Sequence, residues 1–246
     1  MNMFKDKVAI VTGGNSGIGY ATAKELIAKG AVVIITGRRK EAIEKAAAEL
    51  GAIAIVADQG KLADIDRLAA EVSGRFGKVD ILFINAGIGT FAPVENTTEE
   101  QFDSVMNVNF KGAYFTLSKF VPFLQDGASV IMLSSNSATM SIVNSSVYSA
   151  SKSALNTLTR IAAAELAPRR IRVNAISPGP TQTEIMSKFG IDEVTLTEIK
   201  ASLVTRIPLR KIGTAEDVAK WVVYLSGEAA SFITGSEFVM DGGMML

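Results

Sequence analysis

Seven short apolar segments, separated by longer amphipathic stretches, constrain the fold of this 246-residue chain more than any other feature. A strand that is buried on both faces reads as a continuous apolar run, which is typical of a parallel sheet covered by helices on each side. This alternation predicts an α/β protein with a doubly wound parallel sheet of about seven strands. The strand-like segments are residues 8–11, 32–36, 52–56, 81–84, 130–133, 171–176 and 238–240.

The stretches between these strands predict helices at residues 17–29, 41–50, 62–76, 99–124, 146–166 and 215–225. No repeat, linker or low-complexity tract divides the chain, so we expect a single dinucleotide-binding catalytic domain over residues 1–246. Residues 181–208 depart from the alternation. They follow the sixth strand at the carboxyl edge, where doubly wound folds bind ligands, so we expect a substrate lid there, with a plain surface excursion as the alternative.

The chain contains neither His nor Cys. This excludes a Ser-His-Asp hydrolase and removes the usual ligands of catalytic zinc, haem and thiol sites, so we expect no metal. Proton transfer must then use Tyr, Lys, Asp, Glu or hydroxyl groups. The charge is balanced, with 25 basic and 25 acidic residues, and the apolar runs are too short to span a bilayer. We therefore expect a cytoplasmic protein that binds neither nucleic acid nor membranes.

Tyr148 and Lys152 are four residues apart in a predicted helix, a spacing that places both side chains on one face. An ammonium group beside a phenol favours the phenolate, so we expect Lys152 to lower the pKa of Tyr148 from its usual value of about 10. Such a tyrosine exchanges a proton near neutral pH. The alternative is a helix with one buried Tyr and one solvated Lys.

A glycine-rich turn joins the first predicted strand to a helix. Glycines allow the backbone to turn tightly and to approach a ligand, and a helix N-terminus supplies free N–H groups and partial positive charge for a diphosphate. The spacing is G-x-x-x-G-x-G rather than G-x-G-x-x-G, in the required strand–turn–helix context. The predicted diphosphate site comprises Gly13, Asn15, Ser16, Gly17, Ile18 and Gly19.

The end of the second strand indicates which dinucleotide binds. An acidic residue there would accept hydrogen bonds from the adenosine ribose, but the chain has Gly37 followed by Arg38 and Arg39. Guanidinium groups bind phosphate in bidentate fashion, so we predict NADP(H), with Arg38 reading the 2′-phosphate and Arg39 as a second contact. Ser16, and not a basic residue, stands just before the second glycine of the turn, so the predicted preference for NADP(H) depends on the two arginines.

Polar residues also follow the third and fourth strands, at the same carboxyl edge. Asp58 comes after the third strand, and Asn85-Ala86-Gly87 comes after the fourth. On these observations alone, each could be an ordinary turn residue at the end of a strand.

The order and spacing of several motifs resemble those of the short-chain dehydrogenase/reductase family over essentially the whole chain. The motifs are Gly13-x-x-x-Gly17-x-Gly19, Asn85-Ala86-Gly87, Tyr148-x-x-x-Lys152 and Pro178-Gly179. The resemblance implies a Rossmann-like fold and an NADP(H)-preferring ketone or carbonyl reductase. It also implies that Asp58 and Asn85-Ala86-Gly87 border the adenine and its ribose. At the other end of the cofactor, it implies that Pro178, Gly179, Thr181 and Thr183 contact the nicotinamide.

The same resemblance implies four catalytic residues. Tyr148 would exchange a proton with the substrate oxygen, and Ser135 would hydrogen-bond that oxygen. Lys152 would lower the pKa of Tyr148 and bind the nicotinamide ribose, while Asn109 would anchor a water that relays protons. Ser134 and Asn107 are the neighbouring alternatives to Ser135 and Asn109.

The substrate is less constrained by the sequence. Apolar residues predicted near the pocket favour an apolar or aromatic ketone: Phe91, Met140, Ile142, Val143, Met186 and Phe189. A 3-oxoacyl-(acyl carrier protein) reductase is the first alternative. The stretch before the fifth strand carries no basic residue for an acidic carrier, although Arg169 and Arg170 could substitute. NAD-linked alcohol or polyol dehydrogenation and a non-catalytic NADP(H) sensor are further alternatives.

The family resemblance also implies a homotetramer. The predicted helix at 146–166 carries small residues on which another helix could pack closely, and the segment at 238–246 is apolar. Both features favour surfaces that are covered by other subunits.

Overall fold

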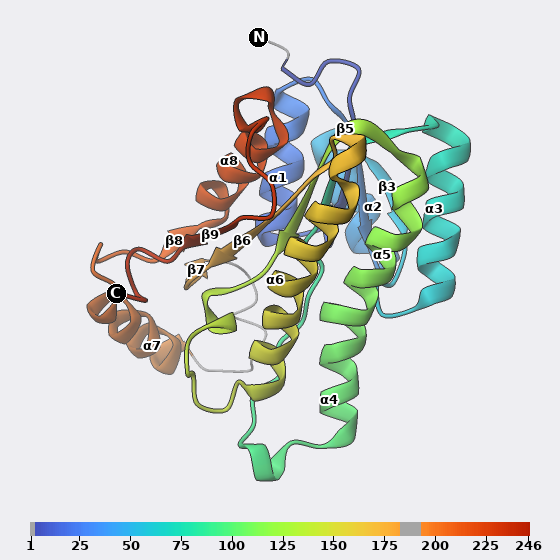
Figure 1. Ribbon diagram of the computed structural model, residues 1–246. Coiled ribbons are helices and arrows are strands. Elements are labelled where there is room, and N and C mark those ends of the chain that lie inside the picture. The colour runs from blue at the N-terminus through green and yellow to red at the C-terminus, as the bar shows by residue number, and fades with distance from the viewer. Residues whose placement is uncertain (1–2, 183–192) are drawn as a thin grey trace.

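The computed structural model describes residues 3–182 and 193–246 and confirms the predicted doubly wound sheet (Figure 1). Seven parallel strands lie in the order β3-β2-β1-β4-β5-β6-β9. They are β1 (Val8–Thr12), β2 (Val32–Gly37), β3 (Ile53–Val56), β4 (Val79–Ile84), β5 (Leu124–Leu133), β6 (Arg172–Pro178) and β9 (Glu237–Met240). The order reverses between β1 and β4, and this switch point is where such sheets bind ligands.

Helices cover both faces of the sheet (Figure 1). One face packs against α1 (Gly17–Ala28), α2 (Lys40–Leu50) and α8 (Ala215–Ser226). The other packs against α3 (Leu62–Phe76), α5 (Ala113–Phe120) and α6 (Ser146–Leu166). Residues that alternate along a strand enter different cores: in β4, Leu82 and Ile84 face α3 and α5, while Ile81 and Phe83 face α1 and α8. The strands are therefore apolar on both faces, as the sequence pattern predicted.

The helix predicted at 99–124 is wrong in two respects. It is interrupted, with α4 (Glu99–Met106) followed by a π-helical turn at Asn107–Gly112 before α5 begins. It also ends at Phe120, because Val121–Phe123 forms a 3-10 turn containing Pro122, which cannot continue a helix. Strand β5 accordingly starts at Leu124 rather than at Val130.

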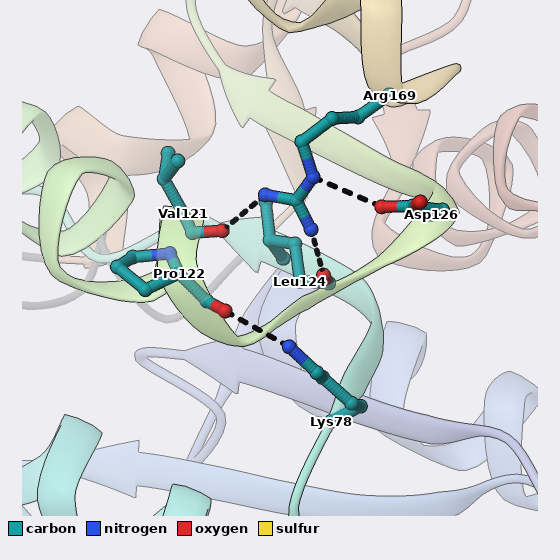
Figure 2. A network of polar contacts seen from close by, with 6 residues as sticks. All are labelled: Lys78, Val121, Pro122, Leu124, Asp126 and Arg169. Atoms are coloured by element: carbon teal, nitrogen blue, oxygen red, sulfur yellow. Dashed lines mark hydrogen bonds and ion pairs between the residues drawn. The ribbon is translucent and has the colours of Figure 1, made fainter.

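A long-range network holds this early start of β5 (Figure 2). The Arg169 guanidinium donates to the Val121 carbonyl at 2.7 Å, to the Leu124 carbonyl, and to the Asp126 carboxylate at 2.9 Å. Lys78 Nζ donates to the Pro122 carbonyl at 3.0 Å. These contacts lie at the amino edge of the sheet, because Leu124 is the first residue of β5 and Arg169 precedes β6, so they are remote from the carboxyl edge.

The segment predicted as a lid, 181–208, contains two described elements. Strand β7 (Thr181–Gln182) pairs with β8 (Gly213–Thr214), and α7 (Glu193–Arg206) precedes β8. Thr183, Met186 and Phe189 lie outside the described residues. Among the helices that are described, none has the length and apolar character needed to cross a membrane.

Candidate active site

A cavity of about 660 Å³ opens at the carboxyl edge of the sheet, at the switch point between β1 and β4. It brings together residues from segments far apart in the sequence. The predicted site residues that line it are Gly13, Asn15, Ser16, Gly17, Ile18, Arg38, Arg39, Asp58, Asn85, Ala86, Gly87, Ser135, Tyr148, Lys152, Pro178, Gly179 and Thr181. Gly19 and Asn109 lie behind its wall, and Thr183 is outside the described residues.

The glycine turn forms one end of the cavity. Gly13 and Gly17 have φ values of 66° and 55°, in the left-handed region that glycine adopts without strain. A Cβ on Gly19 would lie 2.3 Å from the Gly13 carbonyl oxygen, so the turn could not close with a larger residue. Ser16 precedes α1 without a side-chain hydrogen bond to its first turn, which leaves N–H groups open to a ligand. These features fit a bound diphosphate.

Thr12 braces this turn against the end of β4, and sequence reasoning missed it. Its hydroxyl oxygen accepts from the Asn85 and Ala86 N–H groups at 2.9 and 3.0 Å. The Asn85 side-chain amide donates in return to the Thr12 and Gly13 carbonyls at 2.7 and 3.1 Å. Asn85 therefore holds the turn as well as lining the cavity. The available signal in the sequence was a threonine at the end of a buried strand, directly before the glycines.

Gln59 is a second residue that the sequence did not single out. Its side-chain amide donates to the Ala86 carbonyl at 2.9 Å and to the Val108 carbonyl at 3.0 Å. The Gln59 backbone also requires glycine at position 112, where a Cβ would lie 2.0 Å from the Gln59 carbonyl oxygen. The loop after β3 is thus fixed to the π-helical turn that carries Asn109.

The ribose end of the cavity is basic. Arg38 and Arg39 are exposed at its rim, and neither side chain has a hydrogen bond or ion pair with another described residue. The Asp58 carboxylate does not pair with either arginine; it accepts a hydrogen bond from the Gly60 N–H at 3.0 Å. The arginines are therefore available for an anionic group.

Tyr148 and Lys152 come from the first half of α6. Lys152 is almost fully buried, and its Nζ donates to the Leu133 carbonyl at 2.7 Å and lies 5.7 Å from the centre of the Tyr148 ring. The two side chains thus share one face of the helix, as their spacing predicted. Gly87 lies close by, and a Cβ there would be 3.5 Å from Lys152 Nζ.

Burial shifts the pKa of both Tyr148 and Lys152. It raises the pKa of Tyr148 above its usual value, and a hydrogen bond with Ser135 offsets part of this rise. The prediction that the pKa of Tyr148 would be lowered is therefore wrong for this structure, because desolvation disfavours the phenolate more than neighbouring groups favour it. Burial also lowers the pKa of Lys152 to about 8. Tyr148 is consequently protonated at neutral pH.

The buried Lys152 makes stability depend on pH. Its pKa falls from 10.5 to about 8 on folding, so between these values the unfolded chain binds more protons and stability rises with pH. The wild-type protein is expected to gain stability over Lys152→Met as the pH rises. The difference between their free energies of unfolding is expected to grow by up to about 1.4 kcal/mol per pH unit and by about 3 kcal/mol in total near pH 10.5. Urea denaturation of both proteins at fixed concentration from pH 7 to 10.5 measures this, and parallel curves would contradict it.

The geometry distinguishes the two serine candidates after β5. Ser134 is buried, and its hydroxyl donates to the Lys152 backbone carbonyl at 3.2 Å. Ser135 lines the cavity and hydrogen-bonds Tyr148. Of the two, Ser135 has its hydroxyl beside the phenol.

The two asparagine candidates differ in the same way. Asn109 is buried, and its amide donates to the Ile88 carbonyl at 2.8 Å and to Ser151 Oγ at 3.1 Å, while its carbonyl oxygen accepts from the Ile88 N–H at 2.8 Å. Its side chain thus joins the end of β4 to α6. Asn107 is only partly buried, at the start of the π-helical turn.

An aromatic side chain borders the cavity next to Tyr148. The Phe91 ring lies 5.8 Å from the Tyr148 ring, centre to centre, and Phe91 is 49% exposed. The next residue, Ala92, donates its N–H to the Asn144 carbonyl at 2.9 Å. This bond joins the Phe91 loop to the loop that carries Ile142 and Val143, both exposed.

Comparisons with known proteins agree with this arrangement. The family model described as Enoyl-(Acyl carrier protein) reductase matches residues 13–245. Oxidoreductase asL5 of Sarocladium schorii is 38% identical, over 97% of this chain and 95% of that protein. Dehydrogenase/reductase SDR family member 4 of Sus scrofa is 36% identical, over 97% of this chain and 87% of its own.

A solved structure extends the agreement to three dimensions. Levodione Reductase superimposes with a TM-score of 0.92 and 30% sequence identity, over 98% of each chain. Both the sequence matches and this superposition span nearly the whole protein. The chain therefore belongs to the short-chain dehydrogenase/reductase family and is an oxidoreductase with a nicotinamide dinucleotide as its cofactor.

Proposed function

We propose that the protein interconverts an apolar or aromatic ketone and a secondary alcohol with NADP(H), and that Tyr148 is the acid/base catalyst. The observation that carries the proposal is the position of Tyr148, which lines the cavity between Phe91 and Ser135 with Lys152 behind it. A ketone carbon here would have a proton donor and a hydrogen-bond donor at its oxygen.

In the direction of reduction, the bound cofactor supplies a hydride to the carbonyl carbon. Tyr148 gives its phenolic proton to the carbonyl oxygen, and Ser135 donates a hydrogen bond to that oxygen as negative charge develops. The raised pKa of Tyr148 keeps the proton available at neutral pH. One proton from solvent then restores Tyr148, so that ketone, NADPH and a proton become alcohol and NADP⁺.

Lys152 and Asn109 support this step in different ways. Lys152, held by the Leu133 carbonyl, stabilises the phenolate that remains after proton transfer and is close enough to the cavity to bind a ribose hydroxyl. The Asn109 side chain holds Ile88 and Ser151 in place through three hydrogen bonds. These use three of the four hydrogen bonds that an amide can make, so the proposed role of Asn109 as the anchor of a relay water is retained.

Two observations support NADP(H) over NAD(H). Arg38 and Arg39 are exposed at the rim and unpaired with any described residue, and the segment from Gly37 to Arg39 has no carboxylate to repel a 2′-phosphate. The test is to follow absorbance of NADPH and, separately, of NADH with aromatic ketones, aliphatic ketones, β-ketoesters and acyl thioesters. NADPH-dependent turnover of aryl ketones is expected, and preference for NADH would contradict it.

Phe91 supports an aromatic substrate, because its partly exposed ring stands beside the catalytic phenol. Aromatic pairs contribute about 1 kcal/mol beyond the area they bury, so Phe91→Ala is expected to lower kcat/KM for aryl ketones about fivefold or more and for small aliphatic ketones less than about twofold. Steady-state kinetics on matched substrates measures this. Phe232→Ala is the control, since Phe232 is fully exposed and does not line the cavity. An equal loss on both substrate classes would argue against an aromatic pocket.

The alternative function is that of a 3-oxoacyl-(acyl carrier protein) reductase. The description of the matching family model also names an acyl carrier protein, which supports this alternative. Arg169, which could have met an acidic carrier, is instead bound to Asp126 and two backbone carbonyls at the amino edge of the sheet (Figure 2). Arg170 is exposed but lies at the same edge. A much higher kcat/KM on a 3-oxoacyl carrier thioester than on simple ketones would nevertheless favour this alternative.

We also propose a homotetramer. Large apolar side chains are exposed on the helical face at Phe102, Tyr114 and Ile161, and a second group on α8 and β9 contains Trp221 and Val239. Strand β9 is also an edge of the sheet, with free backbone groups along one side. Two such surfaces suit two kinds of subunit contact. Light scattering that gives only a monomer would contradict the proposal.

A further inference from the structure

Ser135 has an unusual set of hydrogen-bond partners. Its Oγ accepts from the Ser137 N–H at 3.2 Å and from the Ser137 hydroxyl at 2.9 Å. A serine hydroxyl has two lone pairs and one proton. Both acceptor positions of Ser135 are thus occupied by the same residue, and its proton remains free to be donated.

That proton has a defined recipient. Ser135 and Tyr148 line the same cavity, and a hydrogen bond between them offsets part of the rise that burial causes in the pKa of Tyr148. Because Ser137 occupies both acceptor positions of Ser135, the Ser135 proton is the one available for this contact. The hydroxyl groups therefore form a chain with one polarity, from Ser137 to Ser135 to Tyr148. Each donor in such a chain polarises the next.

The loop that carries this chain is fixed on helix α6. Ser153 Oγ donates to the Ala138 carbonyl at 2.6 Å, and Ser134 Oγ donates to the Lys152 backbone carbonyl at 3.2 Å. Ser137 is only 4% exposed, so water does not replace its hydroxyl easily. Without that hydroxyl, Ser135 would gain a free lone pair and could accept from Tyr148, which reverses the polarity at the reacting oxygen.

We propose that Ser137 is a positioning residue for the reaction: it forces the Ser135 hydroxyl to act only as a donor, toward Tyr148 in the free protein and toward the substrate oxygen once substrate is bound. The inference rests on the proposed function, because it concerns the same proton transfer. Ser137 does not line the cavity, so it acts through Ser135 and not on the substrate.

A double-mutant cycle tests the inference, with Ser137→Ala, Ser135→Ala and the double variant assayed by NADPH oxidation. Ser137→Ala is expected to lower kcat about tenfold, with KM within about twofold. In the Ser135→Ala background, Ser137→Ala is expected to change kcat by less than about twofold, because the residue through which Ser137 acts is gone. In alcohol oxidation, Ser137→Ala is also expected to raise the apparent pKa of the essential base, since Ser135 becomes a weaker donor.

Ser129→Ala is the matched control. Ser129 is another buried serine after the start of β5, and its hydroxyl donates to the Leu225 carbonyl at 3.0 Å, away from the cavity. Its loss is expected to reduce stability without moving kcat or the pH profile. The inference is overturned if Ser137→Ala keeps wild-type kcat, or if it costs the same factor in both backgrounds. Activity in Tyr148→Phe would instead overturn the proposed function, so the two failures are distinguishable.

Discussion

Replacing Tyr148 by Phe is expected to lower kcat for ketone reduction by about 10³-fold, because general acid catalysis contributes about 10²- to 10⁴-fold and the variant has no proton to give. The ring itself is retained, and with it the contact to Phe91 and the shape of the cavity. KM and the dissociation constant of NADPH are therefore expected to change little. NADPH absorbance measures turnover, and NADPH fluorescence measures binding.

Tyr20→Phe is the control for this variant. Tyr20 lies on α1 outside the cavity lining, and its hydroxyl donates to Glu49 at 3.2 Å, so its loss is expected to leave kcat unchanged. Retention of activity in Tyr148→Phe would exclude Tyr148 as the acid. If the wild-type protein bound NADPH but reduced no carbonyl compound, the sensor alternative would gain support.

Reversing the charge at Arg38 is expected to lower kcat/KM with NADPH about 10²-fold or more. Hydrogen bonds to charged groups contribute about 1.5 to 3 kcal/mol, and the new carboxylate of Arg38→Asp would also repel the 2′-phosphate. The same carboxylate can accept hydrogen bonds from an unphosphorylated ribose, so kcat/KM with NADH is expected to hold or rise. Kinetics with each cofactor at saturating ketone measures both effects.

Arg75→Asp provides the matched charge reversal. Arg75 is on α3, pairs with Glu71 at 2.6 Å and does not line the cavity, so it separates a change in net charge from a local contact. The variant Arg39→Asp, assayed in the same way, measures how much the second arginine contributes to kcat/KM with NADPH. Unchanged NADPH use in Arg38→Asp would refute the phosphate contact and favour the NAD-linked alternative.

The sequence by itself determined the sheet, the glycine turn and the Tyr148–Lys152 pair. Each depends on local regularities: continuous apolar runs for buried strands, glycines where φ is positive, and a four-residue spacing on one helix. The family resemblance then indicated the strand ends at which cavity residues occur. These features are encoded within a few neighbouring residues, and a pattern in the chain therefore predicts them.

The tertiary structure alone decided which long-range hydrogen bonds fix these parts and in which direction the pKa of Tyr148 shifts. Arg169 stabilises the start of β5 from 45 residues away, Asn85 fixes the glycine turn across 73 residues, and nothing in either neighbourhood indicates the partner. Burial similarly raises the pKa of Tyr148, although its neighbour in sequence predicted the opposite direction. Long-range hydrogen bonds and desolvation depend on which surfaces pack together, and that is established only when the whole chain has folded.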